Sequence, residues 1–254
     1  LDGGAQVMVI AGSDARGTIF GIYDFAAKHL GIDPIGNWTG LPPARRDRVV
    51  VDGGDARPAG PAFRFRGWFL NDEDLITGWK LSDERRRLVH FYFHRPIADE
   101  VYEKVFETAL RLRCNLIIPG SYIDLESACD RRIVEAACRR GLFVSQHHTQ
   151  PLGVSAFCFR NYWRDRGKRL EFSYTKNPRE MEIVWGHYAR LWAKYPNVIW
   201  QLGLRGAADR AFWSTDPSAP KTDQERGALV SRAIDRQWEL AREATGATPP
   251  ATAT

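Results

Sequence analysis

Residues 65–74 have the sequence FRGWFLNDED, and this stretch decides the fold. Its apolar run at 67–70 is typical of a strand that is buried on both faces of a parallel sheet. Four polar residues follow the run directly: Asn71, Asp72, Glu73 and Asp74. In barrels of alternating strands and helices, the active site lies at this carboxyl end of the strands. The stretch therefore predicts a buried strand with a functional site at its end.

The pattern of a short apolar strand, polar residues and then a helix recurs three more times along the chain. We predict strands at residues 65–70, 115–120, 142–148 and 197–206, and helices at about 98–113, 124–140, 178–194 and 222–244. Right-handed crossovers make all four strands parallel. A complete barrel has eight such units, so we expect an α/β fold with the first four units of a TIM-type (β/α)8 barrel. An open doubly wound sheet is the alternative, but no glycine-rich phosphate turn follows the first strand.

The residues before this repeat are expected to form a separate unit. Residues 7–11 predict a strand, residues 18–30 a helix that stops at Gly31, and the segment ending near residue 51 a short strand. The stretch at 52–62 concentrates Gly and Pro, which is typical of a domain boundary. We therefore predict the tail of a small α/β domain at 1–56 and half of a barrel at 57–254. Such a chain would be a piece of a longer enzyme.

Composition excludes some classes of function. The chain has 254 residues, 44% of them apolar, which is enough for a large core. Its net charge of +5 comes without a dense run of Lys and Arg, so nucleic acid is disfavoured and a small acidic substrate is compatible. There is no transmembrane run. The four cysteines lack metal spacing, so we expect free thiols, and no metal or other cofactor is predicted.

Polar residues follow each predicted strand, and parallel strands would bring them to one mouth. They are Asn71, Asp72, Glu73, Ser121, Tyr122, His147, His148, Arg205 and Asp209.

Several of these residues also have a purely structural explanation. Asp72 alone would cap a loop, and Arg205 would form an ion pair with Asp209. Of His147 and His148, at most one faces the mouth if strand geometry persists, because adjacent strand residues point to opposite faces. Such a pair is more often one core histidine and one exposed histidine.

The combination favours hydrolysis of a sugar bond next to a carboxylate. Arginine presents a planar fork that holds a carboxylate through two hydrogen bonds. Strand-end carboxyl groups, here Asp72 and Asp209, serve as general acid or base. Aromatic rings would offer faces for sugar rings at Trp79, Tyr122, Trp163 and Trp213, with core packing as the alternative, whereas Trp68 is assigned to the core. The predicted substrate-binding residues are Asn71, Glu73, Tyr122, His147, His148 and Arg205.

Several stretches resemble the glycoside hydrolase family 115 α-glucuronidases. They are SDARGTIFGIYDFAAKHLGI (13–32), FRFRGWFLNDED (63–74), VYEKVFETALRLRCNLIIPG (101–120), the two histidines after the third strand, and LGLRGAAD (202–209). The resemblance implies a small α/β domain before a barrel, and removal of (4-O-methyl)glucuronic acid from xylan with inversion. It places Asn71, Asp72, His148, Arg205 and Asp209 at pocket positions. It also implies a periplasmic or secreted location and allows a homodimer of the whole protein.

The chain departs from the family pattern at three places. It has IPGSY where the family has a WPAMW-like stretch, and Thr149 and Gln150 where a Glu-Pro pair usually follows the histidines. The family sequence RGDGD is RGAAD here, so Ala207 replaces an acid. The family's further pocket acid lies on a later strand, and an inverting hydrolase needs two carboxyl groups roughly 6.5–9.5 Å apart. These differences concern the substrate and the catalytic pair rather than the fold.

Two other functions remain open from the sequence. A carbohydrate-binding protein would keep the pocket without hydrolysis, and Ala207 and Thr149 favour it. A metal-dependent hydrolase would use His147 and His148, but the sequence shows no HxH strand motif and no third ligand at clear spacing.

Overall fold

The computed structural model describes residues 7–51, 57–71, 88–90, 95–97 and 99–246. At its centre lies a four-stranded parallel sheet in the order β1-β4-β5-β6. The four predicted strands are confirmed in position and direction, but each is shorter than predicted. Their bounds are β1 (Gly67–Phe69), β4 (Leu116–Ile118), β5 (Phe143–Ser145) and β6 (Val198–Ile199).

The close approach of β1 to β4 depends on a glycine and an asparagine. Gly67 lies opposite Leu116, and a Cβ atom at Gly67 would lie 2.0 Å from the Leu116 carbonyl oxygen. The Asn115 Oδ1 atom accepts from the Arg66 backbone N–H at 2.8 Å, and its Nδ2 donates to the Arg64 carbonyl at 2.8 Å. This buried side chain therefore continues the ladder beyond β4.

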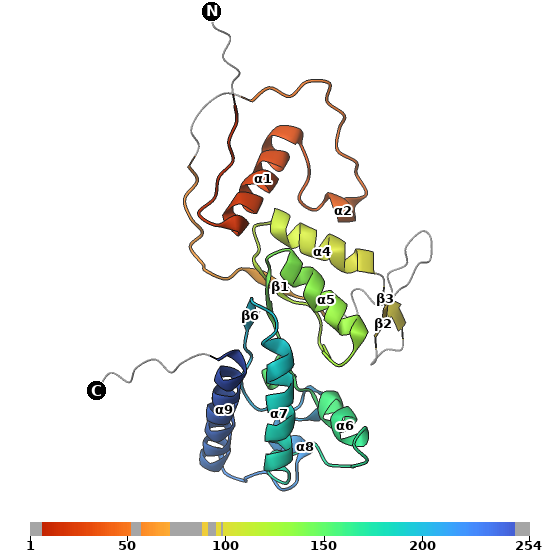
Figure 1. Cartoon of the computed structure of the whole chain (residues 1–254), viewed down its shortest axis with the longest axis vertical. Coiled ribbons are helices and arrows are strands. Elements are labelled where there is room, and N and C mark those ends of the chain that lie inside the picture. The colour runs from red at the N-terminus through yellow and green to blue at the C-terminus, as the bar shows by residue number, and fades with distance from the viewer. Residues whose placement is uncertain (1–6, 52–56, 72–87, 91–94, 98, 247–254) are drawn as a thin grey trace, which may run out of the picture.

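The four predicted helices are confirmed. They are α4 (Asp99–Arg111), α5 (Ala128–Arg139), α7 (Pro178–Trp192) and α9 (Asp223–Thr245). A capping box between Thr222 and Glu225 starts α9, whereas α5 begins later than predicted because Ser127 is its N-cap. Helices α7 and α9 pack side by side, as Figure 1 shows in the lower half of the molecule.

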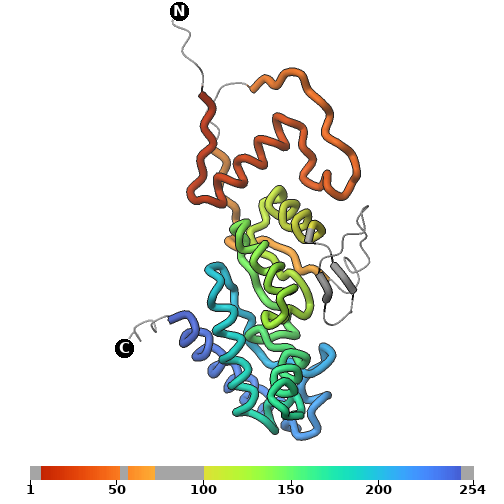
Figure 2. Tube along the Cα trace, turned by 45° about the vertical axis from the view of Figure 1, so that its right-hand side comes forward, coloured from red at the N-terminus to blue at the C-terminus, as the bar shows by residue number. Residues whose placement is uncertain are grey.

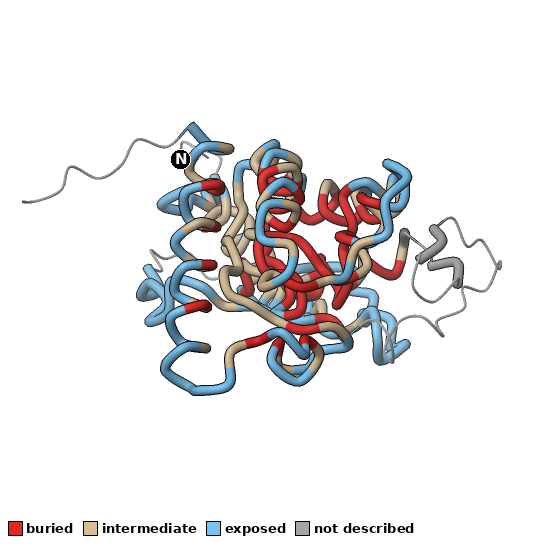
Figure 3. The backbone as a smooth tube through the Cα atoms, turned by 90° about the horizontal axis from the view of Figure 1, so that it is seen from below, coloured by how far each residue is buried: buried red, intermediate tan, exposed pale blue. Residues whose placement is uncertain are grey.

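The core lies between these helices and the sheet. Figure 3 shows the buried residues gathered inside a shell of exposed helix faces. Trp185, Tyr188 and Trp192 from α7 and Phe106 from α4 are among its largest fully buried side chains. Trp68 is half-buried and packs against this core, as predicted.

Of the three elements predicted in the N-terminal residues, the helix is confirmed and the two strands are wrong. Helix α1 (Ala15–Leu30) is confirmed, with Asp14 as its N-cap and Gly31 at φ 68° ending it, and a short helix α2 (Gly36–Thr39) follows. The strands predicted at 7–11 and near residue 51 are wrong, because these segments pair with no strand of the described part. Val7, at 80% exposure, shows that the first apolar run is not buried there.

Arg16 joins this N-terminal part to the sheet. Its Nε donates to the Gly141 carbonyl, its Nη2 donates to Asn197 Oδ1 at 3.1 Å, and its guanidinium lies 4.1 Å from the centre of the Phe143 ring. In addition, Trp38 Nε1 donates to Thr108 Oγ1 of α4 at 2.9 Å. Residues 7–51 therefore sit against α4 and the amino-terminal edge of the sheet, at one end of the molecule (Figure 2).

Several elements were not predicted. The antiparallel pair β2 (Leu88–His90) and β3 (Arg95–Ile97) lies between the first predicted strand and the first predicted helix of the repeat. The segment 151–176, between the third predicted strand and the helix predicted at 178–194, contains the 3-10 helix η1 (Pro151–Gly153) and α6 (Ala156–Arg164). Ser155 Oγ caps α6 by accepting from the Cys158 backbone N–H at 3.2 Å. The 3-10 helix η2 (Ala207–Asp209) and the short α8 (Phe212–Thr215) follow β6.

None of the helices in the described ranges combines the length and the apolar character needed to cross a lipid bilayer. All four cysteines are free, as expected.

Candidate functional site

Hydrogen bonds join the segments that follow β1, β4 and β5, close to the carboxyl ends of these strands. Ser121 Oγ, after β4, donates to Asn71 Oδ1, after β1, at 3.2 Å. Thr149 Oγ1, after β5, donates to the Ser121 carbonyl at 3.1 Å. The predicted convergence of Asn71 and Ser121 is therefore seen, and Thr149 lies beside them although it was not predicted as a site residue.

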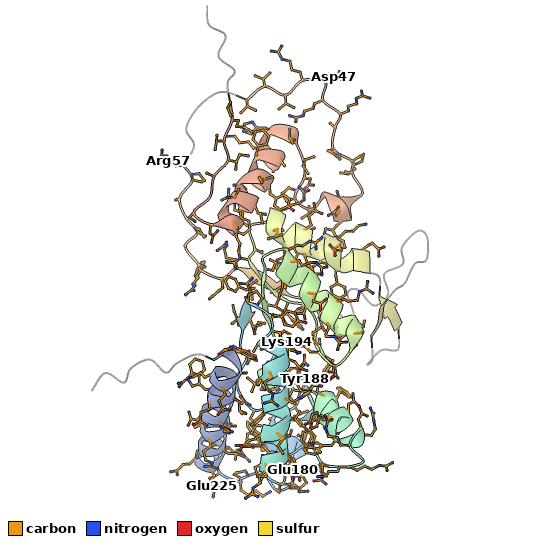
Figure 4. The ribbon with its side chains drawn as sticks, viewed as in Figure 1. Asp47, Arg57, Glu180, Tyr188, Lys194 and Glu225 are labelled. Atoms are coloured by element: carbon orange, nitrogen blue, oxygen red, sulfur yellow. The ribbon has the colours of Figure 1, made fainter. Side chains whose placement is uncertain are left out.

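A buried glutamine in the segment after β5 forms hydrogen bonds with the backbone of the segment after β4. Gln150 is fully buried; its Oε1 accepts from the Ile123 backbone N–H and its Nε2 donates to the Ile123 carbonyl, both at 2.8 Å. Next to it, Asp124 accepts from the Tyr188 hydroxyl at 2.7 Å, and Figure 4 labels Tyr188 on α7. Burial raises the pKa of Asp124, against the lowering effect of the hydrogen bond from Tyr188. The loop after β4 is thus fixed from both sides.

His147 and His148 have different surroundings, as expected for an adjacent pair. His147 is 8% exposed, and its ring stacks on Phe69 with centroids 4.3 Å apart and planes 10° apart. Its Nδ1 lies 2.9 Å from Thr149 Oγ1. His148 is exposed, and its ring centroid lies 3.8 Å from that of His147. Strand β5 has already ended at Ser145, so strand alternation does not apply here, and the two histidine rings lie next to each other with their planes tilted by 53°.

Asp209 gathers two basic side chains from different strand ends. Its Oδ1 lies 2.8 Å from His148 Nε2 and accepts from Arg205 Nε at 2.9 Å, while Arg205 Nη2 donates to the Asp209 carbonyl at 2.7 Å. The ion pair between Arg205 and Asp209 that we considered from the sequence is therefore present. We call Arg205, Asp209 and His148 the Asp209 cluster. All three side chains are partly open to solvent, at 36%, 46% and 52% exposure.

The charge of Asp209 follows from these contacts. Burial raises its pKa, but the hydrogen bonds from Arg205 and His148, together with their charges, outweigh burial and hold the pKa below its ordinary value. Asp209 is therefore ionised at neutral pH. Its backbone is left-handed, with φ 57°, as is that of Ala208, with φ 53°. These two conformations make the tight turn that returns Asp209 to Arg205.

Other predicted residues lie apart from the Asp209 cluster or outside the described ranges. Tyr122 is 9% exposed and its ring packs edge-on against Phe157 of α6, with centroids 5.3 Å apart, which is a packing arrangement rather than an open sugar platform. Trp213 on α8 is 47% exposed, as predicted for such a platform, and Arg226 lies over its ring. Asp72, Glu73 and Trp79 lie outside the described residues.

The metal alternative gains no support from the residues that the structure describes, because no group of three or more His, Cys, Asp and Glu side chains there is placed to hold a metal ion. His147 and His148 face Thr149 and Asp209 instead.

Sequence reasoning missed Thr149 and Gln150 as residues of the site. The signal that pointed to them was their polarity between two histidines and Pro151. We had treated them as departures from a family pattern rather than as partners of the preceding loop.

Two comparisons relate the chain to known proteins. The chain matches the family model "Glycosyl hydrolase family 115" over residues 59–253. It is also similar to the solved structure of "a novel family GH115 4-O-Methyl-alpha-glucuronidase, BtGH115A, with specificity for decorated arabinogalactans", with a TM-score of 0.73 and 26% identity. That match covers 92% of this chain and 29% of the other. No curated protein sequence matches the chain. Because the family model covers most of its length, the chain belongs to glycoside hydrolase family 115.

Proposed function

We propose that this chain forms part of the sugar-binding mouth of an inverting α-glucuronidase. The enzyme would remove glucuronic acid or 4-O-methylglucuronic acid from a decorated polysaccharide. The observation that carries the proposal is the Asp209 cluster, in which an arginine and a histidine from neighbouring strand ends meet on one ionised carboxylate. A xylan chain and an arabinogalactan chain both remain candidates for the polysaccharide.

Arg205 is proposed to hold the carboxylate of the uronic acid. Its Nε and Nη2 contact Asp209, and no hydrogen bond from Nη1 is seen within the described ranges. The outer edge of the guanidinium, formed by Nη1 and the second proton of Nη2, then faces a ligand. Since Asp209 fixes the guanidinium in advance, the substrate carboxylate does not have to order a flexible side chain. His148 adds a hydrogen-bonding group at the same place.

Asp209 is proposed to position Arg205 and His148 rather than to transfer protons. A carboxylate with a lowered pKa that is tied to two basic groups is a weak base and cannot be a proton donor at neutral pH. We therefore assign the acid–base role to Asp72, with a second carboxyl group from elsewhere in the enzyme. Asn71, Glu73 and His147 would bind sugar hydroxyls, with Tyr122 supporting them from the core.

The division of the chain is also a proposal. Residues 1–56 would end a small α/β domain, and residues 57–254 would form the first four units of a (β/α)8 barrel. In the described part, β1 and β6 are the outer strands of the sheet, which is the arrangement expected where a barrel continues. A homodimer and a periplasmic or secreted location remain proposals from family resemblance.

A second candidate function is binding of uronic acids without hydrolysis. It is favoured by the ionised state of Asp209 and by Ala207, which stands where the family pattern has an acid. The two functions share the pocket and differ only in turnover. Incubation of the full-length protein with a glucuronic-acid-substituted oligosaccharide separates them: release of free glucuronate supports the hydrolase, and binding without release supports the second candidate.

The binding claim is tested by isothermal titration with D-glucuronate and with D-glucose. We expect the protein to prefer glucuronate, and Arg205→Ala to remove that preference because the carboxylate loses its charged partner. Arg164→Ala is the matched control, since Arg164 is an exposed arginine whose ion pair is with its neighbour Asp165. If both sugars bind equally well before and after the Arg205 change, the role given to Arg205 is wrong.

A further inference from the structure

The hydrogen bonds around Thr149 determine where the ring proton of His147 lies. A threonine hydroxyl has a single proton, and a backbone carbonyl can only accept. Thr149 Oγ1 lies 3.1 Å from the Ser121 carbonyl oxygen and 2.9 Å from His147 Nδ1. If the hydroxyl proton lies on the carbonyl side, then His147 Nδ1 must donate for both contacts to be hydrogen bonds. If Nδ1 carries the lone pair instead, one of the two contacts is lost.

Burial makes that loss costly. Thr149 is 5% exposed, Ser121 is 2% exposed and His147 is 8% exposed, so water does not readily replace a missing bond. The loss of one buried hydrogen bond should shift the equilibrium between the Nδ1-protonated and the Nε2-protonated ring by about tenfold or more. Gln150 holds the loop that carries Ser121 in place through its two bonds to Ile123, so the carbonyl cannot turn away easily.

We propose that Thr149 is a positioning residue that holds His147 in the tautomer with its proton on Nδ1. In the neutral ring, His147 Nε2 then carries the lone pair and is a hydrogen-bond acceptor. His148 has the opposite arrangement, because its Nε2 lies 2.8 Å from the ionised Asp209 carboxylate and must donate to it. The two adjacent rings thus combine one accepting and one donating imidazole side by side.

This arrangement bears on the sugar substrate, and that consequence rests on the proposed function. A uronic acid offers hydroxyl groups that donate and a carboxylate that only accepts. An accepting nitrogen on His147 matches the chemistry of a hydroxyl donor, whereas Arg205 matches that of the carboxylate. The tautomer of His147 would therefore contribute to discrimination between the hydroxyl side and the carboxylate side of the sugar ring.

The tautomer can be measured directly by nitrogen NMR without any ligand. Long-range ¹H–¹⁵N correlation spectra of the ¹⁵N-histidine-labelled protein distinguish a protonated from an unprotonated ring nitrogen, and His147→Gln identifies the His147 signals. We expect an Nδ1-protonated neutral ring in the wild type and in Thr149→Ser, which keeps the hydroxyl. In Thr149→Val, which keeps the shape, the ratio of Nδ1–H to Nε2–H should fall by about tenfold or more.

Two controls separate this effect from a change in folding. Thr245→Val removes a hydroxyl that donates to the Ala241 carbonyl on α9, and it should leave His147 unchanged. The signals of His29 on α1 report whether the fold of Thr149→Val is intact. An Nε2-protonated ring in the wild type, or an unchanged ratio in a folded Thr149→Val protein, would overturn the proposal.

Addition of D-glucuronate tests the proposed function separately. If glucuronate leaves the signals of both His147 and His148 unchanged, then the proposed function fails, while the spectra of the ligand-free protein still decide the tautomer.

Discussion

Asp209 shows how much of the site depends on single side chains. One carboxylate oxygen contacts Arg205, four residues earlier, and His148, which lies 61 residues away in the sequence. The first contact is local and was considered from the sequence. The second depends on the adjacency of β5 and β6, so no spacing pattern along the chain contains it. The residue types of the site and its local ion pair were therefore predictable, whereas the contact between residues of different strand ends was not.

The lowered pKa of Asp209 predicts a pH dependence of stability. A carboxyl group whose pKa is lower in the folded state stabilises the fold above its unfolded pKa, and loses this effect as pH falls through the folded value. We therefore expect wild type and Asp209→Asn to differ in urea midpoint at about pH 5, where the Asp209 carboxylate is charged in both the folded and the unfolded chain. The difference should shrink below pH 3.8, the ordinary value for Asp. A difference that grows as the solution becomes more acidic would contradict the ionised state assigned to Asp209.

The turn before Asp209 predicts a stabilising substitution. Ala208 has φ 53°, a left-handed conformation that is strained for a residue with a Cβ atom. Ala208→Gly should raise the free energy of unfolding by about 0.5–1 kcal/mol, because the relief of strain exceeds the added freedom of the unfolded chain. Ala207 is not among the residues with positive φ, so Ala207→Gly should be destabilising. Urea unfolding of both variants measures this, and loss of stability in Ala208→Gly would show that the turn is not strained.

At the level of elements, the four strand–helix units were predictable because each strand is an apolar run and each helix has an amphipathic repeat. The strand at 7–11 failed because an apolar run becomes a strand only where another strand pairs with it. Helix α6 was missed although Ser155 is a favoured N-cap residue type, because the burial of its aromatic residues, including Phe159 and Trp163, depends on the core that they pack against. The lengths of the four strands were overestimated, because only pairing with a neighbouring strand determines where a strand ends.

Gly67 predicts how closely β1 and β4 can approach. Gly67→Ala would place a methyl group against the Leu116 carbonyl, and the strands would have to separate. We expect a loss of about 1–3 kcal/mol in the free energy of unfolding, as for overpacked interiors. Gly227→Ala is the matched control, because Gly227 lies in α9 with nothing within 4 Å of an added Cβ. Its helix should gain about 0.5–1 kcal/mol. Thermal or urea unfolding of both variants gives the comparison, and equal effects would mean that strand spacing does not require glycine.

On the scale of the whole molecule, the parallel sheet places the polar loops together at the carboxyl ends of its strands. Its opposite edge meets the N-terminal part through Arg16, which contacts Gly141 before β5 and Asn197 before β6. The carboxyl edge carries Asn71, Ser121, Thr149 and the Asp209 cluster, so structural and proposed functional contacts lie at different ends of the same strands. This separation is the arrangement expected of barrel enzymes.

The central claim is that the Asp209 cluster recognises a uronic acid by binding the carboxylate of the sugar. The most direct measurement follows the Nε–H resonance of Arg205 by NMR during titration with D-glucuronate and, in parallel, with its methyl ester, which keeps the sugar and removes the charge. The account predicts a saturable shift of this resonance with glucuronate and a much smaller one with the ester. Equal shifts with both compounds, or none with glucuronate, would contradict it.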